Sequence, residues 1–478
     1  MSAGHGGGSP MLKFINSWTD LNGWVEWMGG WGMSRALFLG IIFAGEFLVL
    51  GSLIPNVFTF TFGWLIGTAP IWVPAGLFIG FWHVWVWYIQ SLFLSGRNPV
   101  LLEMRIPREV TKSPRAMELA LTLFSISSGE TTFIQRGWKG QVRPFFSFEI
   151  ASFGGELHFY IWCWKSYKSE VEAAIYGQYP EVELIEVEDY ASKFQYDSKT
   201  HDGFAAEWRL ETYQHGISAS DFKINAYQPR TYIDFELDKD PKEEFKIDPL
   251  ATVLEFLGSI EPQEQIWVQL VIRKCGNKGI LKQWEEDHLW MDAVAHEVEK
   301  IRTGAAIVQG KTVKEVFSDM GEKEEDHRQP QPRATWKQQE QMKSMERHMG
   351  KYPFEFGGRA IYLTSGHLHS PIFTGMRWLW KPLGNPQYMT HLRPRRWNCD
   401  FDYPWQDVGG IRWHNQIRRA IDAFRRRMFF HSPWIIPTNI LTNETLATLW
   451  HPPSSTIVTP GIARIPATKA APPANLPK

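Results

Sequence analysis

Candidate phosphate- and metal-binding residues are few in this sequence. The segment from Gly304 to Thr312 ends in Gly-Lys-Thr like a phosphate-binding loop, but its leading glycine lies one residue too far away and no apolar strand precedes it. Two imidazoles occur in Gly366-His367-Leu368-His369, without a third ligand at metal spacing. The sequence therefore predicts no metal, no cofactor and no catalytic residue, and we expect that the chain is not an enzyme.

Two polar side chains stand out because of where they lie. Between Ala36 and Ser95, Glu46 and His83 are the residues that could carry charge near neutral pH. A carboxylate inside a bilayer is costly and is often functional. A protonated Glu46 that hydrogen-bonds between protomers explains it equally well, so we favour a structural role for both residues over ion conduction.

The apolar stretch of residues 36–95 predicts a two-helix transmembrane hairpin. A bilayer core of roughly 30 Å needs about 20 apolar helical residues, and residues 36–54 and 75–94 each supply such a run, with an outer loop over residues 55–70 between them. A buried soluble hairpin is the alternative, but it would need a polar face. Aromatic side chains suited to the membrane interface lie in the second run, at Trp82, Trp85, Trp87 and Tyr88.

Basic residues near the apolar runs predict the orientation. Lys13 and Arg35 precede the first run, Arg97 and Arg105 follow the second, and the predicted loop carries no basic residue. Because basic residues favour the cytoplasmic side, we expect two spans with both termini in the cytoplasm. Residues 1–35 are expected to form an amphipathic or flexible N-terminal segment and not a signal peptide.

Composition restricts the remaining possibilities. The 478-residue chain carries 50 basic and 51 acidic residues, so no global field predicts a nucleic-acid partner. Its three cysteines lack paired spacing, which argues against a disulfide framework and a zinc site. The 24 tryptophans gather near the hairpin and again between Trp378 and Trp413, so both regions are expected to touch an interface.

Residues 98–200 are expected to form one ferredoxin-like domain. Alternating residues predict strands over 100–107, 146–150, 157–164 and 182–187, and helices are expected from Ser113-Pro114 and from Ser166. Gly154-Gly155 predicts the hairpin turn between the middle strands. The order is βαββαβ.

One face of that predicted sheet carries aromatic side chains. His158, Tyr160, Trp162 and Trp164 alternate along one strand and would share this face. RNA-binding domains of this topology stack bases on such residues, but their glycine-flanked signature is absent. We therefore favour packing against another domain or protomer over base stacking.

A second ferredoxin-like domain is expected over residues 225–400. Its first strand is predicted at residues 233–237, followed by a helix at 249–260 and a strand at 266–272. Residues 278–350 are highly charged with helical spacing, which predicts a helical insertion in a hairpin of this domain. Solvated antiparallel helices and a coiled-coil docking arm both remain open.

The last regions are basic and then proline-rich. Residues 401–432 predict a basic amphipathic helix from Ile411 to Phe430, with charges at Arg412, Arg418, Arg419, Arg425, Arg426 and Arg427. We favour contact with the inner leaflet or a protomer, with DNA-backbone contact as the alternative. Residues 433–478 are expected to be a linker-like tail with one helix, begun by Thr442-Asn443-Glu444.

Several segments carry a resemblance to a known family. They are Met104-Arg-Ile-Pro-Arg-Glu, Lys112-Ser-Pro, Ser147-Phe-Glu-Ile, Phe159-Tyr-Ile-Trp, Ile175-Tyr-Gly-Gln-Tyr-Pro, Glu186-Val-Glu-Asp-Tyr, Leu441-Thr-Asn-Glu-Thr-Leu-Ala-Thr-Leu-Trp-His-Pro-Pro, Thr459-Pro-Gly-Ile and Lys469-Ala-Ala-Pro-Pro-Ala-Asn-Leu-Pro. This pattern resembles a membrane-proximal domain of uncharacterised function in bacterial, Patescibacteria-like ATPases akin to the coupling proteins of conjugation and type IV secretion.

The resemblance implies an inner-membrane protein of a DNA or protein translocation system. In that family the chain continues into a RecA-like motor, whereas this sequence ends at Lys478, so no catalytic residue carries over. We therefore expect an inner-membrane anchor or scaffold that docks a separate ATPase subunit and forms homo-oligomers. The alternatives are a membrane-tethered nucleic-acid-binding protein, with DNA as partner, and a structural component of a membrane assembly.

Overall fold

The structure is a computed structural model of an α+β chain. It describes residues 35–53, 56–107, 110, 112–126, 130, 132–212, 226–237, 248–276, 288–307, 334–385, 390–396, 405, 407–436, 438–454, 457, 459, 461–462 and 464–465. The chain divides into two compact units, Met1–Trp85 with Asn398–Gln416, and Val86–Trp397 with Ile417–Lys478.

Apolar helices dominate the first unit. Helix α3 spans Arg35–Leu53 and α4 begins at Asn56 and runs to Ser95, and the rings of Phe47 and Phe62 meet edge to face at 6.5 Å. Within the described residues, one helix, Thr59–Ser95, is long and apolar enough to cross a membrane, judged by length and composition.

The expected outer loop over residues 55–70 is wrong from Asn56 onward. Helix α4 runs through this segment without a break and includes Pro70 and Pro74. The segment carries no charge that would favour a loop in water, and prolines are tolerated in apolar helices of this kind. The two equal spans of the prediction are therefore not supported: within the described residues, α4 supplies the one helix that is long and apolar enough, and α3 contributes the shorter apolar segment Gly40–Val49.

One sheet organises the second unit. Its strands are β1 (Pro99–Pro107), β2 (Phe145–Phe153), β3 (Glu156–Trp164), β4 (Glu183–Val187), β5 (Asp202–Thr212), β6 (Glu264–Lys274), β7 (Pro353–Thr364), β8 (Thr390–Arg396), β9 (Asn439–Thr442) and β10 (Arg464–Ile465). The sheet order is β10-β1-β3-β2-β6-β7-β5-β8, with β4 also paired to β1 and β9 to β7. All these pairs are antiparallel except β1 with β10.

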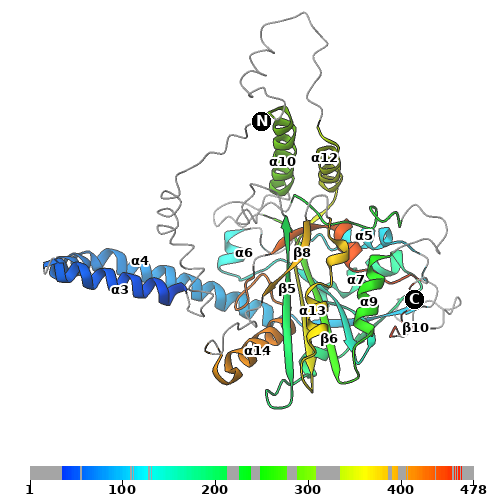
Figure 1. The fold of residues 1–478 in the computed structure, drawn as a ribbon, viewed down its shortest axis with the longest axis horizontal. Helices are drawn as coiled ribbons and strands as arrows, with labels where there is room; N and C mark the ends of the chain where they lie inside the picture. The colour runs from blue at the N-terminus through cyan, green and yellow to red at the C-terminus, as the bar shows by residue number, and fades with distance from the viewer. Residues whose placement is uncertain are drawn as a thin grey trace, which may run out of the picture. The chain divides into compact units, whose positions relative to one another are not determined.

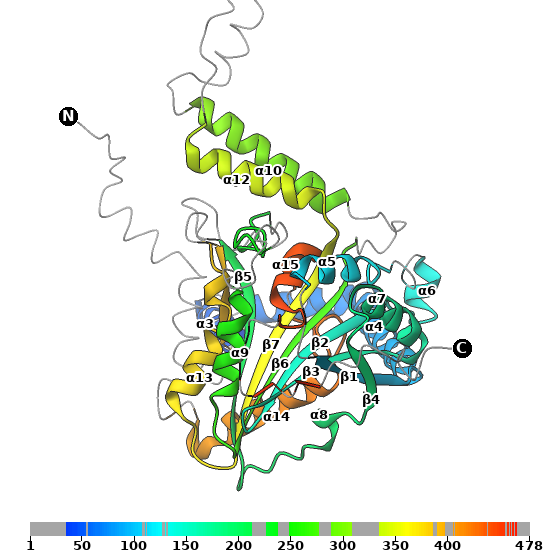
Figure 2. The ribbon, with the colours of Figure 1, turned by 90° about the vertical axis from the view of Figure 1, so that its right-hand side faces the viewer.

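Helices of this unit fall between the strands in chain order. They are α5 (Pro114–Thr122), α6 (Phe133–Gly137), α7 (Lys168–Gln178), α8 (Tyr190–Lys193), α9 (Pro249–Gly258), α10 (His288–Ile307), α12 (Trp336–Met349), α13 (Ser370–Arg377) and α15 (Asn443–Leu449). Figure 1 and Figure 2 show the sheet with α9 and α13 against it. Helix α14 (Ile411–Arg425) has its C-terminal part, from Ile417, in this unit.

The two faces of the sheet carry different side chains. One face is apolar, with Phe148, Leu270 and Phe356 buried beneath the helices, and Trp450 at the end of α15 packs its ring 5.0 Å from that of Phe148. The other face, here called the polar face, carries Glu149 opposite Gln269 at the centre of the β2–β6 pair. Both of these polar residues are fully buried.

The strand expected over residues 233–237 is wrong. Residues 232–237 form turns, because the Asp234 carboxylate accepts a hydrogen bond from the Thr231 backbone at 2.9 Å and the chain then passes through Glu236 with a φ of 56°. The strand in that role is β5, where Phe204, Ala206, Trp208 and Leu210 alternate. The alternation was present in the sequence but the prediction missed it.

The expectation of a linker over residues 433–478 is wrong for its central part. Strand β9 pairs with β7, and every residue of α15 is buried. The apolar side chains Leu446, Leu449 and Trp450 complete the core beneath the sheet, so burial of apolar surface holds this segment in place. The proline-rich end, 466–478, lies outside the described residues.

A pair of helices, α10 and α12, lies between β6 and β7 in the chain. Figure 1 shows the two helices side by side. Trp290, Val294 and Val298 of α10 pack with Met345 of α12 and with Tyr227 from the 226–237 turn. Each helix therefore buries one apolar stripe, and the pair is attached to the body of the unit through this small core.

Candidate functional site

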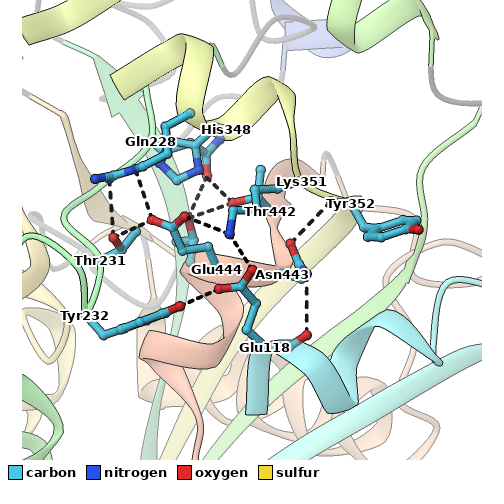
Figure 3. Close-up of polar contacts among 12 residues, drawn as sticks. Glu118, Gln228, Thr231, Tyr232, His348, Lys351, Tyr352, Thr442, Asn443 and Glu444 are labelled. Atoms are coloured by element: carbon cyan, nitrogen blue, oxygen red, sulfur yellow. Dashed lines mark hydrogen bonds and ion pairs between the residues drawn. The ribbon is translucent and has the colours of Figure 1, made fainter. Parts of the chain in front are cut away.

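A partly buried polar cluster lies where the helical pair joins the sheet. We call it the Glu444 cluster, and Figure 3 shows most of its members. They come from α5, the 226–237 turn, the end of α12 and the β9–α15 junction, and are Glu118, Thr231, Tyr232, Asp234, Arg347, His348, Lys351, Thr442, Asn443 and Glu444.

Glu444 is the centre of this cluster. Its side chain is fully buried at the start of α15. Thr231 donates its hydroxyl to the carboxylate at 2.6 Å, Arg347 Nε lies 3.3 Å away and Lys351 Nζ lies 3.5 Å away. A buried carboxylate is stable only when paired in this way, so Glu444 joins three segments that are far apart in the sequence.

Glu118 is the second carboxylate of the cluster. It accepts hydrogen bonds from Lys351 at 2.5 Å and from the Tyr232 hydroxyl at 2.5 Å. Burial and then the hydrogen bond to Glu118 raise the pKa of Tyr232 well above its usual value, which keeps the phenol protonated as a donor. Lys351 thus bridges α5 and α15 through two carboxylates.

Asp234 fixes the turn to the end of α12. Arg347 donates to both carboxylate oxygens of Asp234, at 3.0 and 3.2 Å. Burial alone would raise the pKa of Asp234, but the hydrogen bonds and charge of Arg347 outweigh burial and lower it. The two-point contact of a planar guanidinium gives this pair a defined geometry.

His348 is buried beside these charges. Its Nδ1 lies 2.9 Å from the Thr442 hydroxyl. Burial, followed by the nearby charge of Arg347, lowers the pKa of His348 to about 3. The imidazole is therefore neutral at physiological pH and acts as a packing and hydrogen-bonding group.

Asn443 closes the cluster against β7. Its backbone N–H donates to the Tyr352 carbonyl at 3.0 Å, and its side-chain oxygen accepts from the Tyr352 backbone at 3.2 Å. Its side-chain amide also donates to the Glu118 carbonyl at 3.4 Å. Chemically, the cluster is a set of paired charges and hydrogen bonds that joins the end of α12 to the sheet.

A second buried network lies on the polar face. Arg427, fully buried, donates to Glu149 at 3.0 and 3.2 Å and to Asp189 at 2.9 Å. Tyr190 donates its hydroxyl to the same Glu149 carboxylate at 2.7 Å. This network fastens the chain after α14 to the middle of the sheet.

The predicted aromatic face is covered by the chain itself. Tyr160 stacks on Tyr190 at 5.0 Å, the guanidinium of Arg427 lies 5.7 Å from the Trp162 ring, and all three of Tyr160, Trp162 and Trp164 are buried. His158 is part-buried and contacts Glu103 at 2.7 Å. The open aromatic face expected from the sequence is thus filled by α8 and the end of α14.

The arginines predicted to form a basic surface differ in exposure. Arg412, Arg418, Arg419 and Arg426 are exposed, whereas Arg425 donates to the Ala191 carbonyl at 2.8 Å. Placing Arg427 on the surface was wrong, because α14 ends at Arg425 and not at residue 430, and Arg427 takes a φ of 51° that turns its side chain inward. The aromatic face and the basic helix were predicted as separate features, but in the structure Arg427 lies over the aromatic face.

The intramembrane and interface residues lie on the apolar helices. Glu46 is exposed on α3, and His83 is exposed on α4 with its Nδ1 2.8 Å from the Ile79 carbonyl. Trp87 and Tyr88 are also exposed, and Trp82 and Trp85 are half-buried. The roles predicted for these residues in a membrane stay predictions.

The paired histidines do not form a metal site in the described part of the chain. His369 Nδ1 lies 2.8 Å from the buried Glu264 carboxylate. Among the described residues, no group of three His, Cys, Asp or Glu side chains could hold a metal ion. Of the Gly304–Thr312 segment, residues 304–307 lie in α10 and the rest lies outside the described residues.

Sequence reasoning missed the buried ionic residues of both networks. Glu149 lies within an apolar strand, which was a signal for a paired buried charge. Glu444 was taken as part of a helix start, and nothing local to it indicated its distant partners. The search for known relatives adds no family: no protein-family model matches the chain, and no curated protein is significantly similar to it.

Proposed function

We propose that the protein is a membrane-anchored, non-catalytic scaffold that presents the α10–α12 pair to a partner. The observation that carries this proposal is the Glu444 cluster, in which the buried carboxylates of Glu444 and Glu118 pair with the partly exposed Arg347 and Lys351 at the end of α12. A cluster of this kind would hold the α10–α12 pair in one position on the sheet while a partner binds to it. The apolar helix Thr59–Ser95 supports membrane attachment.

We infer that the sheet consists of two ferredoxin-like halves. The order βαββαβ occurs as β1-α5-β2-β3-α7-β4 and again as β5-α9-β6-β7-α13-β8. The corresponding sheet orders are β4-β1-β3-β2 and β8-β5-β7-β6. Along the sheet, the second order follows the first in reverse, with the β2–β6 pair between them. These halves would share one continuous sheet, with the α10–α12 pair as the insertion in the second half.

The partner in this proposal is a separate ATPase subunit of a type IV secretion or conjugation-like system at the bacterial inner membrane. This part rests on the resemblance of residues 98–190 and 433–477 to the membrane-proximal domain of coupling-protein-like ATPases. Two membrane segments with both termini in the cytoplasm, and a homo-oligomeric ring, belong to the same proposal.

Exposed side chains on α12 offer a direct test. Trp336, Lys337 and Lys343 are exposed on this helix. We expect the triple change Trp336→Ala, Lys337→Glu, Lys343→Glu to abolish co-purification of an ATPase in detergent, identified by mass spectrometry. The exposed Lys165→Glu, outside the pair, is the matched control and should retain the partner. Full retention by the triple variant would refute docking through the pair.

Nucleic-acid binding is the weaker proposal. It requires the aromatic face and the Arg-rich helix, but Trp162, Trp164 and Arg427 are buried. The exposed arginines would have to carry it, and these are Arg412, Arg418, Arg419 and Arg426. Steeply salt-dependent DNA binding by the full chain, lost in Arg418→Ala, Arg419→Ala, would favour this function over the scaffold.

A further inference from the structure

Helix α6 exposes an unusual amount of apolar surface for its size. Of the side chains in and beside this short helix, Phe133 is 38% exposed, Ile134 is 59% exposed and Trp138 is 58% exposed. Large apolar side chains that cluster on one exposed element mark an interaction site. The charged side chains between residues 132 and 141 are Arg136 and Lys139, and both are basic.

The helix is held in a fixed position. A capping box joins Thr132 and Gln135 at its start, so both backbone donors of that turn are satisfied. At its end, Gly140 has a φ of 62°, and a Cβ there would lie 2.4 Å from the Ile89 carbonyl oxygen of α4. The exit of α6 is therefore packed directly on the backbone of α4, with no room for a side chain between them.

The neighbouring turns of α4 carry a matching apolar surface. Trp87 is 49% exposed, Tyr88 is 57% exposed and Leu92 is 60% exposed. Helix α4 ends at Ser95, and the guanidinium of Arg97 then lies 4.4 Å from the Phe93 ring and 5.3 Å from the Trp164 ring. This end of α4 thus passes from apolar to basic within a few residues, as expected where a helix leaves a bilayer.

We propose that α6 is a second lipid-contact element, lying in the headgroup layer of the leaflet from which the end of α4 emerges. Ile134 and Trp138 reach the acyl boundary, and Arg136 and Lys139 contact the phosphates of anionic lipids. The close approach of Gly140 to the α4 backbone, the exposed apolar side chains on the neighbouring turns of α4 and the basic charge of Arg136 and Lys139 select a lipid surface as the occupant. This inference rests on the proposed membrane attachment through α4.

The test uses the full chain in nanodiscs of phosphatidylcholine and phosphatidylglycerol. A fluorescent non-natural amino acid replaces Ile134, and lipids brominated near the headgroup serve as quenchers. We expect at least twofold stronger quenching at position 134 than at position 119 on α5, where Leu119 is 52% exposed. Equal quenching at the two positions would overturn the proposal.

Two further arms separate the sources of failure. A probe at position 78 reports whether α4 itself is in the bilayer. Quenching at 78 without quenching at 134 would refute lipid contact by α6 alone. Loss of quenching at both positions would also refute membrane attachment through α4. Arg136→Glu with Lys139→Glu should lower quenching at 134 at least twofold in phosphatidylglycerol discs and leave position 78 unchanged. In cells, a photo-crosslinker at 134 should capture lipid, and capture of a single protein instead would replace lipid as the occupant.

Discussion

At the residue scale, the buried charge of Glu444 is the most sensitive point of the Glu444 cluster. We expect Glu444→Ala to lower the free energy of unfolding by about 3 kcal/mol, because Arg347 and Lys351 lose their buried partner. Urea denaturation of the detergent-solubilised protein measures this change.

Glu346 provides the matched control for that substitution. It forms an ion pair with Arg302 at 2.8 Å, and both side chains are about half exposed. Exposed pairs contribute roughly 0–1 kcal/mol, so Glu346→Ala should be nearly neutral. Similar losses for the two variants would show that burial of Glu444 does not matter.

His348 predicts how the Glu444 cluster responds to acid. The pKa of this histidine is about 3 in the folded chain and 6.5 in the unfolded chain, so only the unfolded state gains a proton as the pH falls below 6.5. Stability is therefore lost between about pH 6.5 and pH 3, by about 2 kcal/mol between pH 7 and pH 5.

The comparison of His348→Gln with the wild type isolates this effect. The variant should lose about 2 kcal/mol less than the wild type over the same pH interval, measured by urea denaturation at each pH. The exposed His296 of α10 is the control, and His296→Gln should keep the wild-type profile. An unchanged profile in His348→Gln would contradict a neutral buried imidazole.

At the element scale, the helical pair depends on a small apolar core. Trp290 is 3% exposed in that core, and Trp290→Ala should destabilise the pair by about 3 kcal/mol through loss of contacts and a residual cavity. Hydrogen exchange of residues 288–307 should accelerate while exchange in β6 and β7 stays slow. Trp336→Ala on the exposed side of α12 is the control and should leave exchange unchanged.

Local patterns predicted the elements that local forces determine. Ser113-Pro114 begins α5, and Gly154 and Gly155, with φ values of 59° and 93°, form the β2–β3 turn as expected. The turn at 232–237 was mistaken for a strand because its alternation of apolar and polar residues is real. A hydrogen bond that the Thr231 backbone N–H donates to the Asp234 carboxylate decides against the strand, and such a bond leaves no trace in hydrophobic periodicity.

The candidate site could not be predicted from the sequence, for a related reason. Glu118 and Lys351, or Glu149 and Arg427, are distant in the chain and meet only after the sheet forms. The types of these residues suggested surface charge, and Arg427 was predicted there. Their pairing depends on register and on where α14 ends, and neither follows from the local sequence.

At the scale of the whole molecule, the C-terminal segment is part of the body. Truncation after residue 437 removes β9 and α15, which pair with β7 and bury Leu446 and Trp450. We expect this variant to lack a protease-resistant body in limited proteolysis of membranes. Truncation after residue 466 keeps all described elements and is the control, so equal resistance of the two variants would contradict an integral role for α15.

The pairing of the last strands has a consequence for how the protein is made. Strand β10 adds to β1 near the beginning of the body, and β9 adds to β7, so the sheet receives its final members from the end of the chain. Domains tend to fold as the ribosome releases them, but this body can close only after residue 465 has left the exit tunnel. Until then the nascent chain holds an unfinished sheet, with the edges of β1 and β7 that β10 and β9 later occupy still unpaired.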